Sequence, residues 1–230
     1  MGLWNLAIHY VAPMFIVTSP LTSYADQIRN IHVTKSSRGF SLDTPLIMLL
    51  ASVLRCFYWL GANFEKSLLY QSMIMIVVQL TLLKVALDNR PAHDASVPFA
   101  AIKKEDVRPF SFWQWRNQRP YWEFLAYFFS AFTFLQIFFG SSQTFIDLTG
   151  YLSLGIEAVL PLPQVLENQR SRSCSGFRLS VLASWILGDV MKQVFFFSSE
   201  HVGNEFKICA GLQMMLDMYL GVQFFMFGNG

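Results

Sequence analysis

The stretch Leu162–Lys192, LPQVLENQRSRSCSGFRLSVLASWILGDVMK, has a second copy 137 residues earlier in the chain. That copy, Ala25–Arg55, reads ADQIRNIHVTKSSRGFSLDTPLIMLLASVLR, and the two align without a gap. The aligned identities include Gln27 with Gln164, Ser36 with Ser173, Gly39 with Gly176, Phe40 with Phe177, Leu42 with Leu179 and Leu50 with Leu187. Self-similarity at a fixed offset is the signature of a repeated structural unit. The chain is therefore expected to contain two copies of one unit.

The composition indicates a membrane protein. Of the 230 residues, 53% are hydrophobic and 14% are charged, whereas soluble domains carry roughly 25% charged residues. Mean hydropathy is +0.38 and Phe alone accounts for 23 residues, which is more apolar surface than a soluble protein of this size can bury. The net charge of +2 does not indicate a nucleic-acid partner. The three cysteines stand far apart and predict neither a disulfide framework nor a zinc site.

Seven stretches are apolar and long enough to cross the hydrocarbon as helices, which takes about 20 residues each. They are Trp4–Ile28, Thr44–Ala62, Ser67–Leu87, Tyr121–Phe139, Phe145–Leu166, Arg178–Ser198 and Glu205–Phe227. The expected fold class is therefore all-α, a polytopic membrane protein with seven transmembrane helices. The repeat places three spans on either side of the fourth, and parallel duplications of this kind occur among transporters. The expected parts are a first three-helix bundle at 1–87, a loop and linker helix at 88–143, and a second bundle at 144–230.

The basic residues predict the orientation, because Lys and Arg concentrate in cytosolic loops. The loops after spans one, three and five carry 12 of them, and the opposite side carries only Lys66 and Lys207. The N-terminus is then lumenal and the C-terminus cytosolic. The loop before span four ends in PFSFWQW, where Trp113 and Trp115 suit anchoring at a membrane surface. An amphipathic surface helix is expected there, with a linker bearing one aromatic anchor as the alternative. The aromatic fourth span suits a lipid-facing or connecting helix.

A polar motif marks the cytosolic end of the first helix in each copy. In the second copy, Pro161 and Pro163 interrupt span five, because proline removes a backbone donor and clashes with the preceding turn. Gln164 is expected to bond to the backbone groups that this kink frees, and Gly176 to permit a sharp re-entry into span six.

The first copy has Asp26 before Gln27 where the second has a proline. Its kink is expected to come from Pro13 and Pro20 instead, and Gly39 is expected to permit the re-entry into span two.

Charged residues also fall inside the spans, where each costs ~2.5–3.5 kcal/mol if it faces lipid. They must pair, face a cavity or be neutral. Asp189 and Lys192 have the i, i+3 spacing of an ion pair on one helix face. One interpretation is a buried polar network that sets helix register, and the other is a polar path between the bundles. The residues expected to line such a path are Arg55, Glu157, Gln164, Asp189, Lys192 and Asp217.

The usual signatures of soluble enzymes do not occur. The chain has no phosphate-binding G-x-x-x-x-G-K-[ST] loop, no H-E-x-x-H and no G-x-S-x-G. We therefore expect no catalytic residues, no metal site, no cofactor and no ATP-driven pumping.

The repeat, the Pro-Gln dipeptide and the layout of three, one and three helices resemble the PQ-loop family, whose relatives include cystinosin, the SWEET carriers and the KDEL receptor. The stretches FEKSLLYQSMIMI, FWQW, EAVLPLPQVLENQRSRSCSGF and LGDVMK look most like the subfamily of solute carrier family 66 member two and its fungal phospholipid-scramblase counterpart. The resemblance implies ATP-independent scrambling of phospholipids in Golgi and endosomal membranes, and a functional link to phospholipid flippases. The chain departs from the family pattern at Asp26, where proline is usual.

Two functions from different classes follow. The first is a phospholipid scramblase whose polar residues form a groove for the lipid headgroup. The alternative is a proton-coupled transporter of a small cationic or zwitterionic solute, with Asp189 or Glu157 as the proton site. A sorting receptor for a lumenal ligand is a third reading. The residues do not decide whether the protein forms a homo-oligomer.

Overall fold

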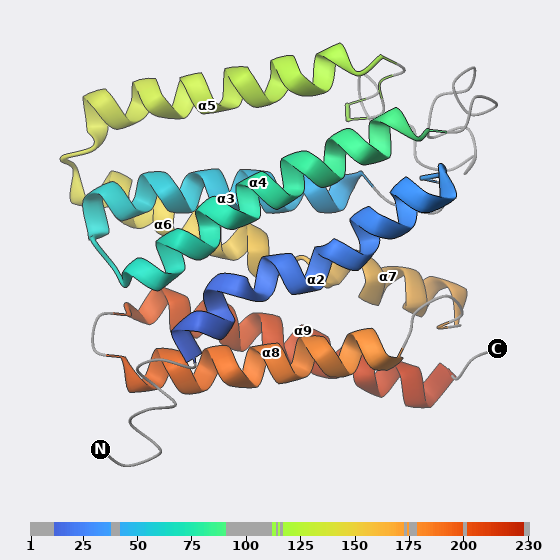
Figure 1. Cartoon of the computed structure of the whole chain (residues 1–230). Coiled ribbons are helices and arrows are strands. Elements are labelled where there is room, and N and C mark those ends of the chain that lie inside the picture. The colour runs from blue at the N-terminus through green and yellow to red at the C-terminus, as the bar shows by residue number, and fades with distance from the viewer. Residues whose placement is uncertain are drawn as a thin grey trace.

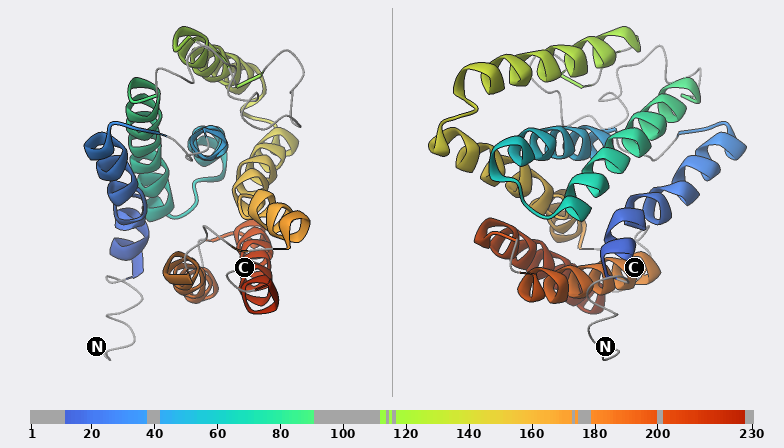
Figure 2. Two further views of the ribbon diagram at one scale, coloured as in Figure 1. Left: turned by 90° about the vertical axis from the view of Figure 1, so that its right-hand side faces the viewer. Right: turned by 60° about the vertical axis from the view of Figure 1, so that its left-hand side comes forward.

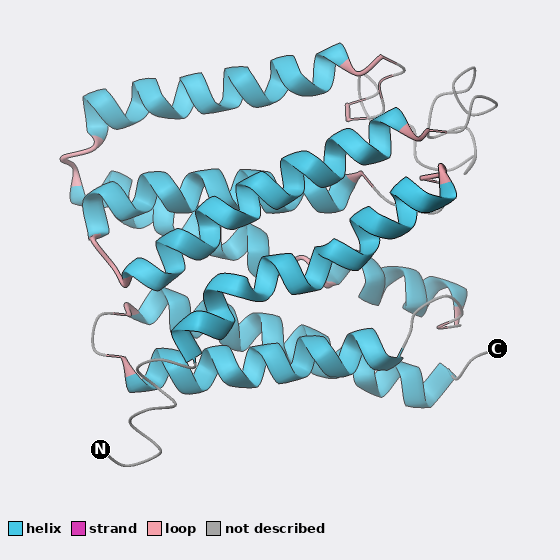
Figure 3. Ribbon diagram, viewed as in Figure 1, coloured by secondary structure: helices cyan, strands magenta, loops and turns pink. Residues whose placement is uncertain are grey.

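The computed structural model describes residues 12–37, 42–90, 112, 113, 115, 117–172, 174, 179–199 and 202–227. All the regular structure in these residues is α-helical (Figures 1 and 3). The helices are α2 (Ala12–Thr34), α3 (Asp43–Ala62), α4 (Lys66–Asp88), α5 (Arg119–Phe139), α6 (Gln143–Ala158), α7 (Leu162–Ser171), α8 (Leu179–Ser198) and α9 (Asn204–Phe227). Within the described residues, α3, α4, α5 and α9 are long and apolar enough to cross a membrane. The chain is thus an all-helical membrane protein, as its composition predicts.

The helix boundaries follow the sequence repeat. Shifted by 137 residues, the end of α2 at Thr34 falls on the end of α7 at Ser171. The next residues, Lys35 and Arg172, are equivalent in the two copies and have φ values of 50° and 52°. A left-handed residue commonly ends a helix, because it directs the chain away from the helix axis. Both copies therefore end their first helix at the same place and in the same way.

The two copies differ at the prolines. The predicted fifth span is interrupted between α6 and α7, where Pro161 precedes the first residue of α7 and Pro163 lies in its first turn. Proline is tolerated in a first turn because the N–H there has no helical partner. In the first copy, α2 runs through Pro20 as a single helix. The expected interruption is confirmed in the second copy, whereas Pro20 does not interrupt the first. Gly39 and Gly176 lie outside the described residues.

A ring is formed, in order, by α2, α4, α3, the α6–α7 pair, α9 and α8, and the left view of Figure 2 shows it end-on. We call these the six ring segments. In the first half α4 packs between α2 and α3, and in the second half α9 packs between α8 and the α6–α7 pair. The halves meet where α3 packs on α6 and where α2 reaches α8. The helix α5, which corresponds to the predicted fourth span, lies outside the ring against α3, and Tyr121 is its only buried residue. This position agrees with the expectation of a lipid-facing or connecting fourth span.

The interface between α3 and α6 depends on close helix approach. A Cβ atom added to Gly150 of α6 would lie 2.8 Å from the ring of Tyr58 on α3. One added to Gly61 of α3 would lie 2.5 Å from the side chain of Ile146 on α6. Small residues at such crossings let helices in a bilayer approach closely, and van der Waals packing then favours their association.

Apolar packing joins the two halves at one end of the ring. Of the three buried apolar clusters in the described residues, only one contains side chains from both halves. It lies where α3 ends and α9 begins, and we call it the bridging cluster. Its members are Ile16, Tyr58, Phe64, Leu68, Ile146, Leu154, Phe195, Phe196, Val202, Phe206 and Ala210. A second cluster belongs to the first half and α5, and the third belongs to the second half.

Trp113 corrects one sequence expectation. Its side chain is only 1% exposed and its indole N–H donates to the carbonyl oxygen of Leu42 over 2.6 Å. The hydroxyl of Tyr121 in turn donates to the carbonyl oxygen of Trp113. Residues 112 and 113 form a turn and not a helix. Trp113 therefore attaches the start of α5 to the first half from within the protein, and residues 91–111 of the same loop lie outside the described part.

Candidate functional site

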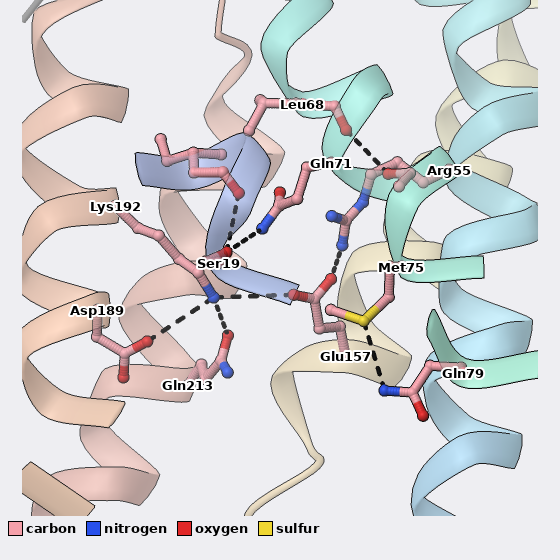
Figure 4. Close-up of polar contacts among 12 residues, drawn as sticks. Ser19, Arg55, Leu68, Gln71, Met75, Gln79, Glu157, Asp189, Lys192 and Gln213 are labelled. Carbon is pink, nitrogen blue, oxygen red and sulfur yellow. Dashed lines mark hydrogen bonds and ion pairs between the residues drawn. The ribbon is translucent and has the colours of Figure 1, made fainter. Parts of the chain in front are cut away.

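The helices α2, α3, α4, α6, α8 and α9 each contribute a polar side chain to one group inside the bundle, and Figure 4 shows this group. We call this group the central polar cluster. It consists of Ser19 on α2, Arg55 on α3, Gln71 on α4, Glu157 on α6, Asp189 and Lys192 on α8, and Gln213 on α9. The surrounding helices are apolar, so this is a concentrated polar site inside a hydrophobic bundle.

Glu157 joins the two halves electrostatically. The guanidinium of Arg55 forms an ion pair with Oε2 of Glu157, and the Nζ of Lys192 lies 3.8 Å from Oε1 of the same carboxylate. The Arg55 side chain is 7% exposed and that of Glu157 13% exposed. Each carboxylate oxygen therefore faces a different cation, one from each half of the protein. Arg55 and Lys192 are equivalent positions of the two sequence copies.

Lys192 also connects the centre to α9. Its Nζ lies 3.9 Å from Oδ1 of Asp189 and donates to Oε1 of Gln213 over 3.5 Å. The predicted Asp189–Lys192 ion pair is thus confirmed. Close to it, the carboxyl group of Asp217 is a neighbour of the Asp189 carboxyl. Both side chains are buried, so the two carboxyl groups share an enclosed site.

The first half closes the cluster on its other side. The amide of Gln71 donates to the hydroxyl oxygen of Ser19 over 3.4 Å, which links α4 to α2. Gln71 is 5% exposed. The sequence analysis placed neither Gln71 nor Ser19 in this site. A serine in an apolar helix ordinarily bonds to its own backbone, as Ser19 also does with Ile16, so the sequence carried little signal for this second role.

A cavity of about 30 Å³ lies between the central polar cluster and the bridging cluster. Its polar wall comes from Arg55, Gln71, Glu157, Lys192, Cys209 and Gln213, and its apolar wall from Leu154, Phe196, Phe206 and Ala210. A space of this size accommodates about one water molecule. In this conformation the site is closed to anything as large as a lipid headgroup.

The end of the ring nearest the bridging cluster is closed by a polar contact as well. The hydroxyl of Tyr58 on α3 donates to Oε1 of Glu205 on α9 over 2.5 Å. Phe64 packs beside it, with ring centroids 5.2 Å from Tyr58 and 4.8 Å from Phe206. This contact joins the first half to the second. Sequence analysis missed it, because Tyr58 and Glu205 are far apart in the chain and neither stands in a recognisable motif.

The Pro-Gln motif lies apart from this centre. Gln164 donates through its amide to Oδ1 of Asn168 one turn further along α7, and not to backbone groups at the kink. Gln27 lies half-buried on α2. Among the predicted path residues, the structure brings together Arg55, Glu157, Asp189 and Lys192, with Asp217 beside them. It shows no contact of Gln164 with this group in the described residues.

Within the described part of the chain, no cluster of His, Cys, Asp and Glu side chains suits a metal ion. Cys209 lines the cavity as a free thiol.

Comparison with known proteins agrees with the duplicated architecture. The PQ loop repeat matches residues 8–68 and 145–202, together slightly more than half of the chain. These segments contain α2 with α3 in the first half and α6 to α8 in the second. The chain is also similar to a Saccharomyces cerevisiae protein named Scramblase ANY1, with 29% identity over 95% of this chain and 71% of the yeast protein. The chain belongs to the PQ-loop repeat family of membrane proteins.

Proposed function

We propose that this protein is an ATP-independent phospholipid scramblase of Golgi and endosomal membranes. The observation that carries the proposal is the central polar cluster, which all six ring segments build at the junction of the two halves. Moving a charged headgroup through hydrocarbon has the desolvation cost that penalises any buried charge. A row of fixed charges reduces that cost, while the acyl chains stay in lipid beside the apolar outer faces. Similarity to a protein named as a scramblase supports this reading.

In the proposed topology the chain crosses the membrane seven times. The α6–α7 pair is a single broken crossing, and α5 connects two three-helix bundles at 1–87 and 144–230. The N-terminus is lumenal and the C-terminus cytosolic, because basic residues, which concentrate in cytosolic loops, follow α2, α4 and α7 in the sequence. The proposed headgroup path runs past Arg55, Glu157, Asp189 and Lys192 (Figure 4), and past Asp217, which neighbours Asp189.

The direct test uses the purified protein in liposomes that contain a fluorescent phospholipid, with dithionite added outside. A scramblase exposes inner-leaflet lipid to the reagent, so fluorescence falls below the level left by protein-free liposomes. If the inner leaflet stays protected, the proposal is wrong.

A matched pair of variants tests the site. Lys192→Gln removes a charge from the cluster and is expected to slow scrambling. Lys84→Gln removes a charge from an exposed position on α4 and is expected to leave the rate unchanged. Equal slowing by both would place the path elsewhere.

A second candidate rests on the Asp189–Asp217 contact. Neighbouring buried carboxyl groups suit a proton site, and the protein would then be a proton-coupled transporter of a small cationic or zwitterionic solute. Uptake driven by a pH gradient and abolished by Asp189→Asn would favour this function over scrambling.

A further inference from the structure

We propose that Glu157 is an internal substitute for substrate. Its carboxylate occupies the position between Arg55 and Lys192 that the phosphate of a zwitterionic headgroup takes. Asp189 and Asp217, beside it, form the subsite for the headgroup ammonium. This inference rests on the proposed function and deepens it by naming the chemistry of the substrate at that site.

The first argument is the way that Glu157 is held. Its two oxygens share one negative charge and face two separate cations, Arg55 on one side and Lys192 on the other. A phosphodiester presents the same pattern, two non-bridging oxygens that share one negative charge. Arginine binds carboxylate and phosphate through the same geometry. A site that holds this carboxylate in this manner therefore suits a phosphodiester in its charge and in its two charged oxygens.

The second argument is an unused donor. The Nε–H of Arg55 is buried and has no hydrogen-bond partner among the described residues. A guanidinium has five N–H donors, and a single carboxylate shared with Lys192 does not engage them all. A phosphodiester has two ester oxygens in addition to its two charged oxygens, so it offers more acceptor atoms than a carboxylate does. The donor set around Glu157 thus exceeds what Glu157 itself can satisfy.

The third argument concerns how Glu157 could leave. It stands one residue before the end of α6 at Ala158, where the interruption at Pro161 separates α6 from α7. Proline provides no backbone donor, so the helix does not continue rigidly through this point. Departure of Glu157 alone would leave Arg55 buried without a counter-ion and Lys192 with Asp189 as its remaining anion, and a buried cation without a counter-ion is strongly unfavourable. An incoming phosphate removes that cost, so exchange of one anion for the other keeps the charge of the site balanced.

The ammonium subsite follows from the acidic side of the cluster. Asp189 and Asp217 are 4% and 1% exposed, and their two carboxyl groups are neighbours. Two neighbouring buried carboxyl groups favour a ligand that supplies N–H groups or positive charge. Lys192 lies between Glu157 and Asp189, so the anionic and cationic subsites are adjacent. This order fits a headgroup in which two carbons separate a phosphate from an amine.

The test measures ligand binding through Cys209, which lines the cavity. The full chain carries Cys56→Ser and Cys174→Ser, and the ligand protects Cys209 from alkylation by N-ethylmaleimide. The probes are glycerophosphoethanolamine, inorganic phosphate and ethanolamine. Glu157→Gln removes the internal competitor with little change in shape, so the affinity for glycerophosphoethanolamine should rise by about tenfold or more. Unchanged affinity in this variant overturns the inference.

Two further variants separate the subsites. Adding Lys192→Gln to Glu157→Gln should abolish the gain for both phosphate-containing probes. Adding Asp189→Asn should reduce binding of glycerophosphoethanolamine but not of inorganic phosphate, and equal loss of both contradicts the ammonium subsite. A ligand-induced rise in the melting temperature of Glu157→Gln checks that the variant is folded and binds.

Lipid and soluble sources of the headgroup are distinguished by adding liposomes of phosphatidylethanolamine in place of the soluble probe. Protection by the soluble probe alone assigns the site to a solute. The proposed scramblase function and this inference are tested by different measurements, namely scrambling by the wild-type protein and ligand binding by Glu157→Gln. Scrambling by the wild-type protein without a gain in Glu157→Gln overturns only this inference, and a gain in binding without wild-type scrambling overturns only the scramblase.

Discussion

Arg55 and Lys192 occupy equivalent positions of the two sequence copies, and both contact Glu157, for which the first copy has no acidic counterpart. A symmetric duplication would place two like charges near each other at the centre of the ring. Glu157 relieves this repulsion. The asymmetry of the two copies is therefore what makes the buried charges compatible with folding.

This pairing predicts a loss of stability. Glu157→Gln leaves Arg55 and Lys192 buried without their shared anion, and removing one partner of a buried pair costs about 3–5 kcal/mol. The melting temperature of the purified variant should fall clearly. Glu123→Gln is the matched control, because Glu123 pairs with Arg119 on the exposed face of α5, and such pairs contribute under about 1 kcal/mol. Similar melting temperatures for the two variants would contradict a stabilising role for Glu157.

At the scale of elements, the contact of α3 with α6 decides whether Arg55 can reach Glu157. That contact depends on Gly150, against which the ring of Tyr58 packs. Gly155 lies on the same helix, α6, and has no such close neighbour. A Cβ atom added to Gly155 would meet nothing within 4 Å.

The two glycines therefore predict effects of opposite sign. Gly150→Ala forces α3 and α6 apart, and we expect a loss of about 1–3 kcal/mol from overpacking. Gly155→Ala adds a methyl group in open space, and we expect a gain of up to about 1 kcal/mol from helix propensity. Thermal unfolding of both variants in the same detergent measures the difference. A loss of stability in Gly155→Ala as large as that in Gly150→Ala would contradict the packing argument.

At the scale of the whole molecule, the halves are joined by the bridging cluster at one end and by the ion pairs at the centre. The clusters towards the other end belong to one half each. The described conformation is therefore sealed at the end of Tyr58 and Glu205. Passage of a headgroup through the ring requires that seal to open, because the central cavity is far too small to hold one.

The contact between Tyr58 and Glu205 predicts that its loss makes Cys209 in the central cavity more accessible to reagents. Tyr58→Phe removes the hydrogen bond to Glu205 and keeps the ring in the cluster. Since a partly exposed hydrogen bond contributes about 1 kcal/mol, we expect Cys209 to react with a charged thiol reagent about fivefold faster in proteoliposomes. Tyr70→Phe is the control, because Tyr70 is 53% exposed on α4. No difference between the two variants would show that this contact does not hold the end closed.

The sequence by itself determined the repeat, the helices and the requirement that buried charges find partners. These properties follow from the 3.6-residue period, from proline chemistry and from the cost of charge in hydrocarbon. The Asp189–Lys192 pair could be predicted because both residues stand on one helix face. The partner of Arg55 could not, because it depends on how closely α3 and α6 pack. For the same reason, only the tertiary structure shows that Trp113 is buried inside the protein and that Gln164 lies apart from the central charges. It also shows that Ser19 lies beside Gln71. Spacing along one helix is a local property, whereas the choice of neighbour across a bundle belongs to the packing of the whole chain.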